Sequence, residues 1–301
     1  MTGVLVRRLS VGHEEIAVAY WTGFFIDPAY RSAFLYPRLL SAMFNGARDA
    51  GLTTMYAAVR RQAADAPLKM GFKKVGDLPV LVKLLRPALF LAKYTKIVRN
   101  DWAGTCVQAV CRLPDAFFAW GTRLFEPRVL GPWRVREGTW SGSTVAGLAE
   151  LYQSDGMIQA GQHWTVDMLL ARYGSAQHEY RVMEVRRGNR VVAAAIVRIV
   201  DRRDAIRAAV IMDLIHEPEA VSAGRLALDA VERLARAAGC DVVLYLEGGS
   251  AASNRLLRRR GYRASSERYS LLLWTDPRAD TPRFPMDPRN WRVTFADHDT
   301  F

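Results

Sequence analysis

Side chains with acid–base chemistry stand at the ends of predicted strands in the second half of the chain. The stretch IMDLIHEPE places Asp213 and His216 at one strand end, where the imidazole could act as a general base because its ordinary pKa lies near neutrality. Glu247 follows the next strand, and Tyr269 lies on a closing strand. The alternatives are structural: His216 as a loop histidine beside a helix cap, and Glu247 and Tyr269 as solvated or packing residues.

The charge balance favours anionic partners. The 301 residues include 42 Lys and Arg against 30 Asp and Glu, a net charge of +12. Such an excess suits nucleic acid, a membrane surface or a phosphate-bearing small molecule, although an arginine-rich genomic composition would also produce it. Without a recognition-helix signal, we do not expect sequence-specific nucleic-acid binding.

Cysteine usage and the first residues indicate a cytoplasmic protein. The three cysteines, Cys106, Cys111 and Cys240, have neither disulfide-framework nor zinc-ligand spacing, so we expect no metal. The start MTGVLVRRLSVGHEE lacks the pattern of a secretory signal. No apolar run reaches the roughly 18 residues that a membrane span requires.

The first part of the chain alternates predicted strands and helices. Residues 4–26 predict two extended segments with a turn near Gly12. A helix begins after Tyr36, with an apolar face from Leu39 to Ala47, and ends at Gly51. A strand at 53–59, a short helix within 61–70 limited by Pro67, and a strand containing a turn in GFKKVGDLPVLVKLL follow.

The later part repeats this order. WRVREG predicts an opening strand, helices follow at 144–153 and 165–173, and strands follow at 180–186, 190–200 and 206–215. A helix at 224–238, the strand DVVLYLE, the helix ASNRLLRRR and a closing strand pair in GYRASSERYSLLLW complete it. GLTTMYAAV with KMGFKKVG corresponds to GCDVVLYLE with RRGYRASS, which indicates an internal duplication.

The series of a strand, x-P-x-Y-R, a helix, a G-x-x-x-x-Y strand, a short helix ending in x-x-G-F and a strand resembles the GNAT superfamily of acyl-CoA-dependent N-acetyltransferases. The resemblance covers roughly residues 15–80 and 129–275, in tandem. It implies an α/β fold of two GNAT-like mixed-sheet domains, in which the fourth and fifth strands separate around the pantetheine of acetyl-CoA. We expect a partial domain at 1–78, a basic helical connector at 79–128, a second domain at 129–275 and a tail at 276–301.

The first domain is expected to be N-terminally incomplete, because only about 25 residues precede its helix-initiating loop. A missing N-terminal segment, a strand supplied by the tail NWRVTFADHDTF, or a vestigial fold would each explain this.

The resemblance also implies that main-chain N–H groups at a helix start hold the pyrophosphate of the cofactor, which suits unpaired donors and the positive end of the helix dipole. The family loop R/Q-x-x-G-x-G/A is matched only at its arginine, and Pro67 and Leu257 replace the tyrosine that protonates the leaving thiolate. The implied cofactor-binding residues are Phe25, Ile26, Arg31, Ser32, Ala33, Phe34, Leu35, Tyr36, Gly224 and Arg225.

Two arginine-rich surfaces complete the expectations. Arg255 and Arg259 share a helix face and could bind an adenosine phosphate, or could simply be solvated together with Arg258 and Arg260. Residues 79–140 carry 10 basic and 4 acidic residues among apolar faces, so this connector could contact an anionic bilayer or pack across both domains.

The predicted activity is transfer of an acetyl or similar acyl group from acyl-CoA to an amine on a small or sugar-like acceptor. The alternatives are a catalytically inactive GNAT-like binding or scaffold protein and a peripheral membrane protein that works through the connector.

Overall fold

The computed structural model describes residues 3–12, 14–22, 27, 35–95, 107, 109–117, 131–154, 159–174, 179–202, 206–280 and 283–297. Its strands are β1 (Gly3–Val11), β2 (Glu14–Thr22), β3 (Thr54–Arg60), β4 (Lys73–Leu84), β5 (Trp133–Gly138), β6 (Ala160–Gln162), β7 (Tyr180–Arg187), β8 (Arg190–Asp201), β9 (Arg207–His216), β10 (Val242–Leu246), β11 (Arg263–Thr275) and β12 (Trp291–Arg292). Its helices are α1 (Leu35–Asp49), α2 (Asp65–Lys69), α3 (Pro87–Tyr94), α5 (Gly142–Gln153), α6 (Val166–Tyr173), α7 (Val221–Ala237) and α8 (Ala251–Arg259), with a further helix at 109–117.

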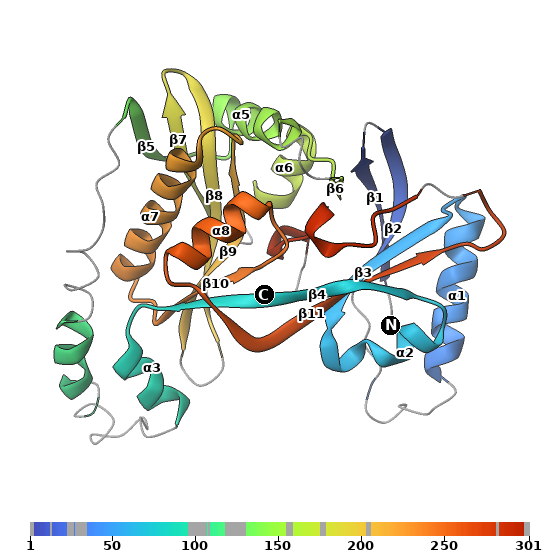
Figure 1. Cartoon of the computed structure of the whole chain (residues 1–301), viewed down its shortest axis with the longest axis horizontal. Coiled ribbons are helices and arrows are strands. Elements are labelled where there is room, and N and C mark those ends of the chain that lie inside the picture. The colour runs from blue at the N-terminus through green and yellow to red at the C-terminus, as the bar shows by residue number, and fades with distance from the viewer. Residues whose placement is uncertain are drawn as a thin grey trace.

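The described strands form one mixed sheet of 12 strands in the order β12-β6-β1-β2-β3-β11-β4-β10-β9-β8-β7-β5 (Figure 1). Within it the chain repeats one series: β2, α1, β3, α2 and β4 form a first unit, and β9, α7, β10, α8 and β11 form a second. In each unit the first two strands are parallel, β2 with β3 and β9 with β10. The predicted α/β fold class, a mixed sheet with two halves of the same element order, is thereby confirmed.

The last strands of the two units are exchanged. β11 pairs antiparallel with β3, β4 pairs antiparallel with β10, and β4 and β11 pair with each other at the centre (Figure 1). Each unit therefore completes the sheet of the other. The expected boundary between residues 78 and 79 falls inside β4, because this strand runs on to reach β10.

Two details of the strand predictions were wrong. The turn expected within residues 71–85 is absent, since β4 is hydrogen-bonded to β11 and β10 along its course. The expected closing pair at 261–274 is the single strand β11. A register shift between Ala264 and Arg268 takes up the polar residues that suggested a turn.

Glycines set the ends of the two long helices. Gly51 follows α1 with φ 72° and Gly239 follows α7 with φ 74°, a left-handed conformation that costs glycine little. The buried side chains of α1 are Leu40, Met43, Phe44 and Ala47, which recur with helical period and fix the helix on the sheet.

The helices and the C-terminal segment cover opposite faces of the sheet. Side chains of α1 and of α7 with α8 pack on one face, in two separate clusters. Side chains of α5, α6 and residues 284–296 pack on the other face, in one cluster that spans both units. The C-terminal segment thus belongs to the common core and is not a loose tail.

The C-terminal segment also connects one edge of the sheet to the loop after β10 in the second unit. β12 pairs parallel with β6, Trp291 opposite Ala160, and the N–H of Val293 donates to the main-chain oxygen of Gly248 at 2.8 Å. A Cβ at Gly248 would stand 1.8 Å from the oxygen of Val293, so only glycine allows this approach. The tail does supply a strand, although of two residues.

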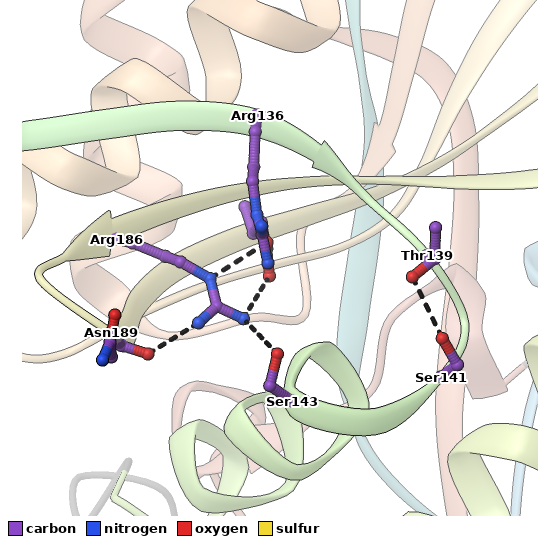
Figure 2. A network of polar contacts seen from close by, with 7 residues as sticks. Arg136, Thr139, Ser141, Ser143, Arg186 and Asn189 are labelled. Carbon is purple, nitrogen blue, oxygen red and sulfur yellow. Dashed lines mark hydrogen bonds and ion pairs between the residues drawn. The ribbon is translucent and has the colours of Figure 1, made fainter.

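A buried ion cluster holds the opposite edge of the sheet together (Figure 2). Glu184 of β7 is fully buried and accepts from Arg136 of β5 and from Arg186. Arg186 also donates to the Ser143 hydroxyl at 3.2 Å and to the main-chain oxygen of Asn189 at 2.6 Å. One guanidinium therefore connects the hairpin between β7 and β8 to the start of α5.

Part of the expected connector is described. Asp115 in helix 109–117 is buried and accepts hydrogen bonds from the N–H groups of Ala88 and Leu89, at the start of α3. The carboxylate thus caps one helix from the other. Within the described ranges, no helix is both long and apolar enough to cross a bilayer.

Candidate functional site

The parallel strands of the second unit stop pairing where β9 still continues. The last pair is Ile211 with Tyr245, and β9 runs on to His216. Beyond this point the Ser253 hydroxyl, on α8, donates to the main-chain oxygen of Leu214 at 3.2 Å, and Ser253 is only 1% exposed. The main-chain oxygen of Leu214 at this strand edge is therefore already hydrogen-bonded to a side chain of the protein.

His216 fills the space between the end of β9 and the start of α7. Its ring is 4% exposed, and its Nδ1 donates to the main-chain oxygen of Glu217 at 2.8 Å. A Cβ at Gly224 would stand 2.5 Å from the Cδ2 of His216, so glycine is needed for the contact. The Nε2 has no hydrogen-bond partner among the described residues, so its lone pair stays available to a proton donor.

The start of α7 is only partly open. Its N-cap residue is Ala220, which provides no capping side chain, and the following residues Val221 and Ser222 are exposed. Gly224 is buried beneath His216, and Arg225 lies 3.9 Å from the Asp229 carboxylate. The N–H groups of Ala223 and Gly224 donate to the main-chain oxygen of Ala220, which leaves those of Val221 and Ser222 as the donors at the helix start.

Asp213 lies on the opposite face of β9 from His216. It is 1% exposed, accepts from the Tyr152 hydroxyl at 2.8 Å and forms an ion pair of 3.0 Å with Arg292. Burial, and then the neighbouring Asp213 carboxylate, raise the pKa of Tyr152 well above its ordinary value. Asp213 is thus committed to Tyr152 and Arg292 and does not cooperate with His216.

A second buried ion pair joins the first strand to the C-terminal segment. Arg7 lies 3.2 Å from an oxygen of Asp297, donates to the Tyr56 hydroxyl at 3.3 Å and stacks over the Tyr20 ring at 3.9 Å. Asp297 also accepts from the N–H of Thr294. Burial raises the pKa of Asp297, against the lowering effect of Arg7.

A cavity of about 710 Å³ opens beside α8. Glu247 lies in its wall, where both carboxylate oxygens accept from Arg258 at 2.5 and 2.6 Å, so Glu247 is held as an ion pair. Three of the four arginines noted from the sequence line the cavity, whereas Arg260 turns away to Asp229 and Glu232. The lining residues are Asp77, Leu78, Pro79, Glu247, Gly249, Ala251, Asn254, Arg255, Arg258, Arg259, Pro288 and Arg289.

The remaining predicted site residues lie elsewhere. Tyr269 is 3% exposed in the core, opposite Arg60 of β3 and Leu78 of β4. The predicted catalytic residues Asp213, His216, Glu247 and Tyr269 therefore do not form one cluster.

In the first unit, Leu35 and Tyr36 begin α1, and burial raises the pKa of Tyr36 to about 12. Six predicted cofactor-binding residues lie outside the described residues: Phe25, Ile26, Arg31, Ser32, Ala33 and Phe34.

Neither position of the expected leaving-group acid holds an ionisable group. Leu257 of α8 is fully buried, and Pro67 of α2 is buried as well. Within the described ranges, no three His, Cys, Asp or Glu side chains gather so that they could hold a metal ion.

Sequence reasoning did not single out Arg7, Tyr152, Arg292 or Asp297. A signal for Arg292 was present, since Trp291, Val293 and Phe295 alternate with polar residues as in a half-buried strand, whereas Asp297 does not follow this alternation. Their ion-pair partners are distant in the sequence, since Asp213 lies 79 positions before Arg292 and Arg7 lies 290 positions before Asp297, and no local pattern reveals such pairs.

Comparison with known proteins shows the fold. No protein-family model and no curated protein matches the sequence. Two structures of Saccharomyces cerevisiae N-myristoyltransferase with bound myristoyl-CoA match 91% of this chain, with TM-scores of 0.62 and 0.61 and identities of 11% and 12%. A GCN5-related N-acetyltransferase from Anabaena variabilis matches 90%, with a TM-score of 0.56 and 10% identity.

The alignments cover 63%, 66% and 58% of those chains, so this chain spans less than two thirds of their length. These structural matches agree with the two parallel strand pairs of this chain, each of which has a helix between its strands. The chain has the fold of the GNAT superfamily of acyl-CoA-dependent N-acyltransferases.

Proposed function

We propose that the protein transfers an acyl group from acyl-CoA to an amine. The fold supports this proposal, because it contains two parallel strand pairs in which a helix follows the first strand. The N-myristoyltransferase neighbours carry bound myristoyl-CoA, which supports an acyl-CoA as the co-substrate. We further propose an acetyl or similar acyl group and a small or sugar-like amine acceptor.

The first unit is the better candidate for holding the cofactor. The single observation that carries this assignment is the hydrogen bond from Ser253 to the oxygen of Leu214, which occupies the strand edge of the second unit. The His216 ring packs against Gly224 in the same region. We therefore assign the cofactor pyrophosphate to the passage from β2 into α1, at residues 25–36.

Isothermal titration with acetyl-CoA, myristoyl-CoA and desulfo-CoA tests cofactor binding. We expect binding of at least one thioester, weakened at least about tenfold by Arg31→Glu, because a cation next to a phosphate is replaced by an anion. Arg233→Glu, the same charge change at an exposed position on α7, is the matched control and should leave affinity unchanged. No heat and no thermal shift with any of the three ligands would overturn the proposal.

Catalysis has a separate readout in the release of the coenzyme A thiol on addition of amines. One set of observations favours a protein that binds without transferring: Leu257 and Pro67 stand where the leaving-group acid is expected, and Asp213 is held in an ion pair. Binding of acyl-CoA without thiol release, across primary amines of small molecules and amino sugars, would establish this second function instead.

A further inference from the structure

The cavity beside α8 lies apart from the strand edge considered for the cofactor. Ser253 and Leu257 point from α8 into the protein, and both are buried. The cavity is lined instead by residues 251, 254, 255, 258 and 259, on the other side of the helix. Its remaining walls come from residues 77–79 in the middle of β4, from Glu247 and Gly249 after β10, and from the 3-10 turn Pro288–Asn290, so both units and the C-terminal segment build it.

Most charges in the wall of the cavity are already paired. Arg258 is held by Glu247, and Arg289 donates to Asp287 at 2.6 Å. Asp77 is neutralised by Lys74 and accepts from the Ser270 hydroxyl at 2.9 Å. The carboxylates of Glu247 and Asp77 therefore present little free negative charge to a ligand. The guanidiniums of Arg258 and Arg289 likewise present little free positive charge.

Two charges are left over. Arg255 and Arg259 line the cavity, are exposed, and form no hydrogen bond or ion pair with the described residues. Because they are four positions apart on one helix, their Cβ atoms lie about 5–6 Å from each other. The cavity thus has a net charge of two positive units at one helix face, within reach of a single anionic group.

The rest of the wall is suited to an uncharged body. Leu78, Pro79, Ala251 and Pro288 contribute apolar surface. Asn254 uses its amide N–H to donate to the oxygen of Gly249 at 3.1 Å, while its own Oδ1 is buried and has no donor among the described residues.

We propose that this cavity binds a phosphate monoester with a compact, partly apolar body. A phosphate monoester carries about −1.5 to −2 charges near neutral pH, which matches the two unpaired guanidiniums. Guanidinium also binds phosphate through paired N–H donors, which an ammonium cannot do. Binding at this site does not require acyl transfer, and the ligand is a molecule other than the acyl-CoA cofactor.

The phosphate group that binds in the cavity could belong to a separate metabolite or to coenzyme A itself. Isothermal titration with phenyl phosphate, and with 3′,5′-ADP as the phosphate-bearing part of coenzyme A, separates these sources. Binding of phenyl phosphate that 3′,5′-ADP does not displace assigns the cavity to a separate ligand. Displacement by 3′,5′-ADP would overturn the independence of the site and make it the phosphate end of the cofactor site.

The double variant Arg255→Glu/Arg259→Glu should weaken phenyl phosphate binding at least about thirtyfold, because two attractive charges become repulsive. Arg233→Glu is the control and should bind as the wild type does. Ala251→Trp, which fills the cavity from an exposed helix position, should weaken phenyl phosphate binding without changing the charge. Since these residues lie on the surface, the melting temperature should stay close to that of the wild type.

Undiminished affinity in the double arginine variant would overturn the proposal, as would the absence of binding by phenyl phosphate to the wild type. The acyl-CoA titration is measured separately, so failure here leaves the proposed acyltransferase function standing, and the reverse also holds.

Discussion

The hydroxyl of Ser253 donates to the main-chain oxygen of Leu214, across the gap between α8 and the unpaired end of β9. This contact lies at the strand edge of the second unit, where the resemblance to acyl-CoA-dependent N-acetyltransferases led us to expect a thioester. Both residues are buried, so no solvent replaces the bond.

Replacement of Ser253 by alanine should lower the free energy of unfolding by about 1–3 kcal/mol, because the buried oxygen of Leu214 loses its donor. The acyl-CoA affinity should stay within about twofold of the wild type, since the cofactor is assigned to the first unit. Urea denaturation and titration with acetyl-CoA measure the two quantities. Markedly tighter acetyl-CoA binding would instead place the cofactor in the second unit.

The effects of replacing Arg292 and Asp213 on the free energy of unfolding should be strongly coupled. Arg292→Met leaves the Asp213 carboxylate buried without its cation, which should cost about 3–5 kcal/mol of unfolding free energy. The double variant Arg292→Met/Asp213→Asn should cost less than the sum of the single changes, by about 2 kcal/mol. Urea denaturation of all four proteins completes the cycle.

The exposed pair of Arg289 with Asp287 is the control for this cycle. Arg289→Met should leave the free energy of unfolding close to that of the wild type, because water already solvates both groups. Strict additivity of the Arg292 and Asp213 changes would show that the buried ion pair does not hold the C-terminal segment on β9.

Asp297 should make stability depend on pH in an unusual direction. Its pKa is raised in the folded protein by burial, so the folded state takes up a proton at a higher pH than the unfolded chain does. The contribution of Asp297 is therefore lost as pH rises through the raised pKa and is fully present below the unfolded value of about 3.9. The stability advantage of the wild type over Asp297→Asn should increase as pH falls from about 7 to about 4.

Urea midpoints of the two proteins at several pH values, at constant ionic strength, measure this difference. The matched variant Asp287→Asn removes an exposed carboxylate whose pKa is lowered by Arg289, so its difference from the wild type should shrink as pH falls. An Asp297 difference that shrinks in the same way would contradict the assignment.

We also propose that α3 and helix 109–117 contact anionic membranes. Their apolar residues are unusually exposed: Leu91 60%, Tyr94 68%, Val110 71%, Leu113 78% and Phe117 74%. The acidic residue of helix 109–117, Asp115, turns inward to cap α3, whereas Arg112 is exposed. Lys93 is committed to Asp241 at 2.7 Å, so apolar replacements test this surface better than charge reversal at Lys93.

Flotation with vesicles containing phosphatidylserine should carry the wild type upward, and Leu113→Ser/Phe117→Ser should reduce the bound fraction at least about tenfold. Leu170→Ser, at a partly exposed apolar position on α6, is the control and should float like the wild type. Equal flotation of the two variants, or none by the wild type, would contradict membrane contact through these helices.

Local patterns were sufficient to predict most elements. The helical spacing of Leu40, Met43, Phe44 and Ala47, and the glycine after it, placed α1 correctly, and the apolar run DVVLYLE placed β10. Such signals depend on neighbours within one or two turns, which the sequence states directly. The repeated order then gave the fold.

The exchange of β4 and β11 could not be predicted in this way. Leu81 of β4 and Leu271 of β11 have the same apolar character whichever unit they complete, so the choice of partner depends on contacts between distant segments. The ion pairs of Arg7 with Asp297 and of Arg292 with Asp213 could not be predicted for the same reason, because each joins segments that are far apart in the sequence. The chemistry and strand position of a residue such as Tyr269 can be read from the sequence, whereas its burial depends on which strands come to lie on either side.

Hydrogen exchange of the full chain with and without acetyl-CoA tests the central assignment most directly. Acetyl-CoA should slow amide exchange in residues 25–36 and at the start of α1, where we place the pyrophosphate, and leave residues 221–225 at the start of α7 unchanged. Protection at the start of α7 and the end of β9, with none before α1, would contradict the assignment of the cofactor to the first unit.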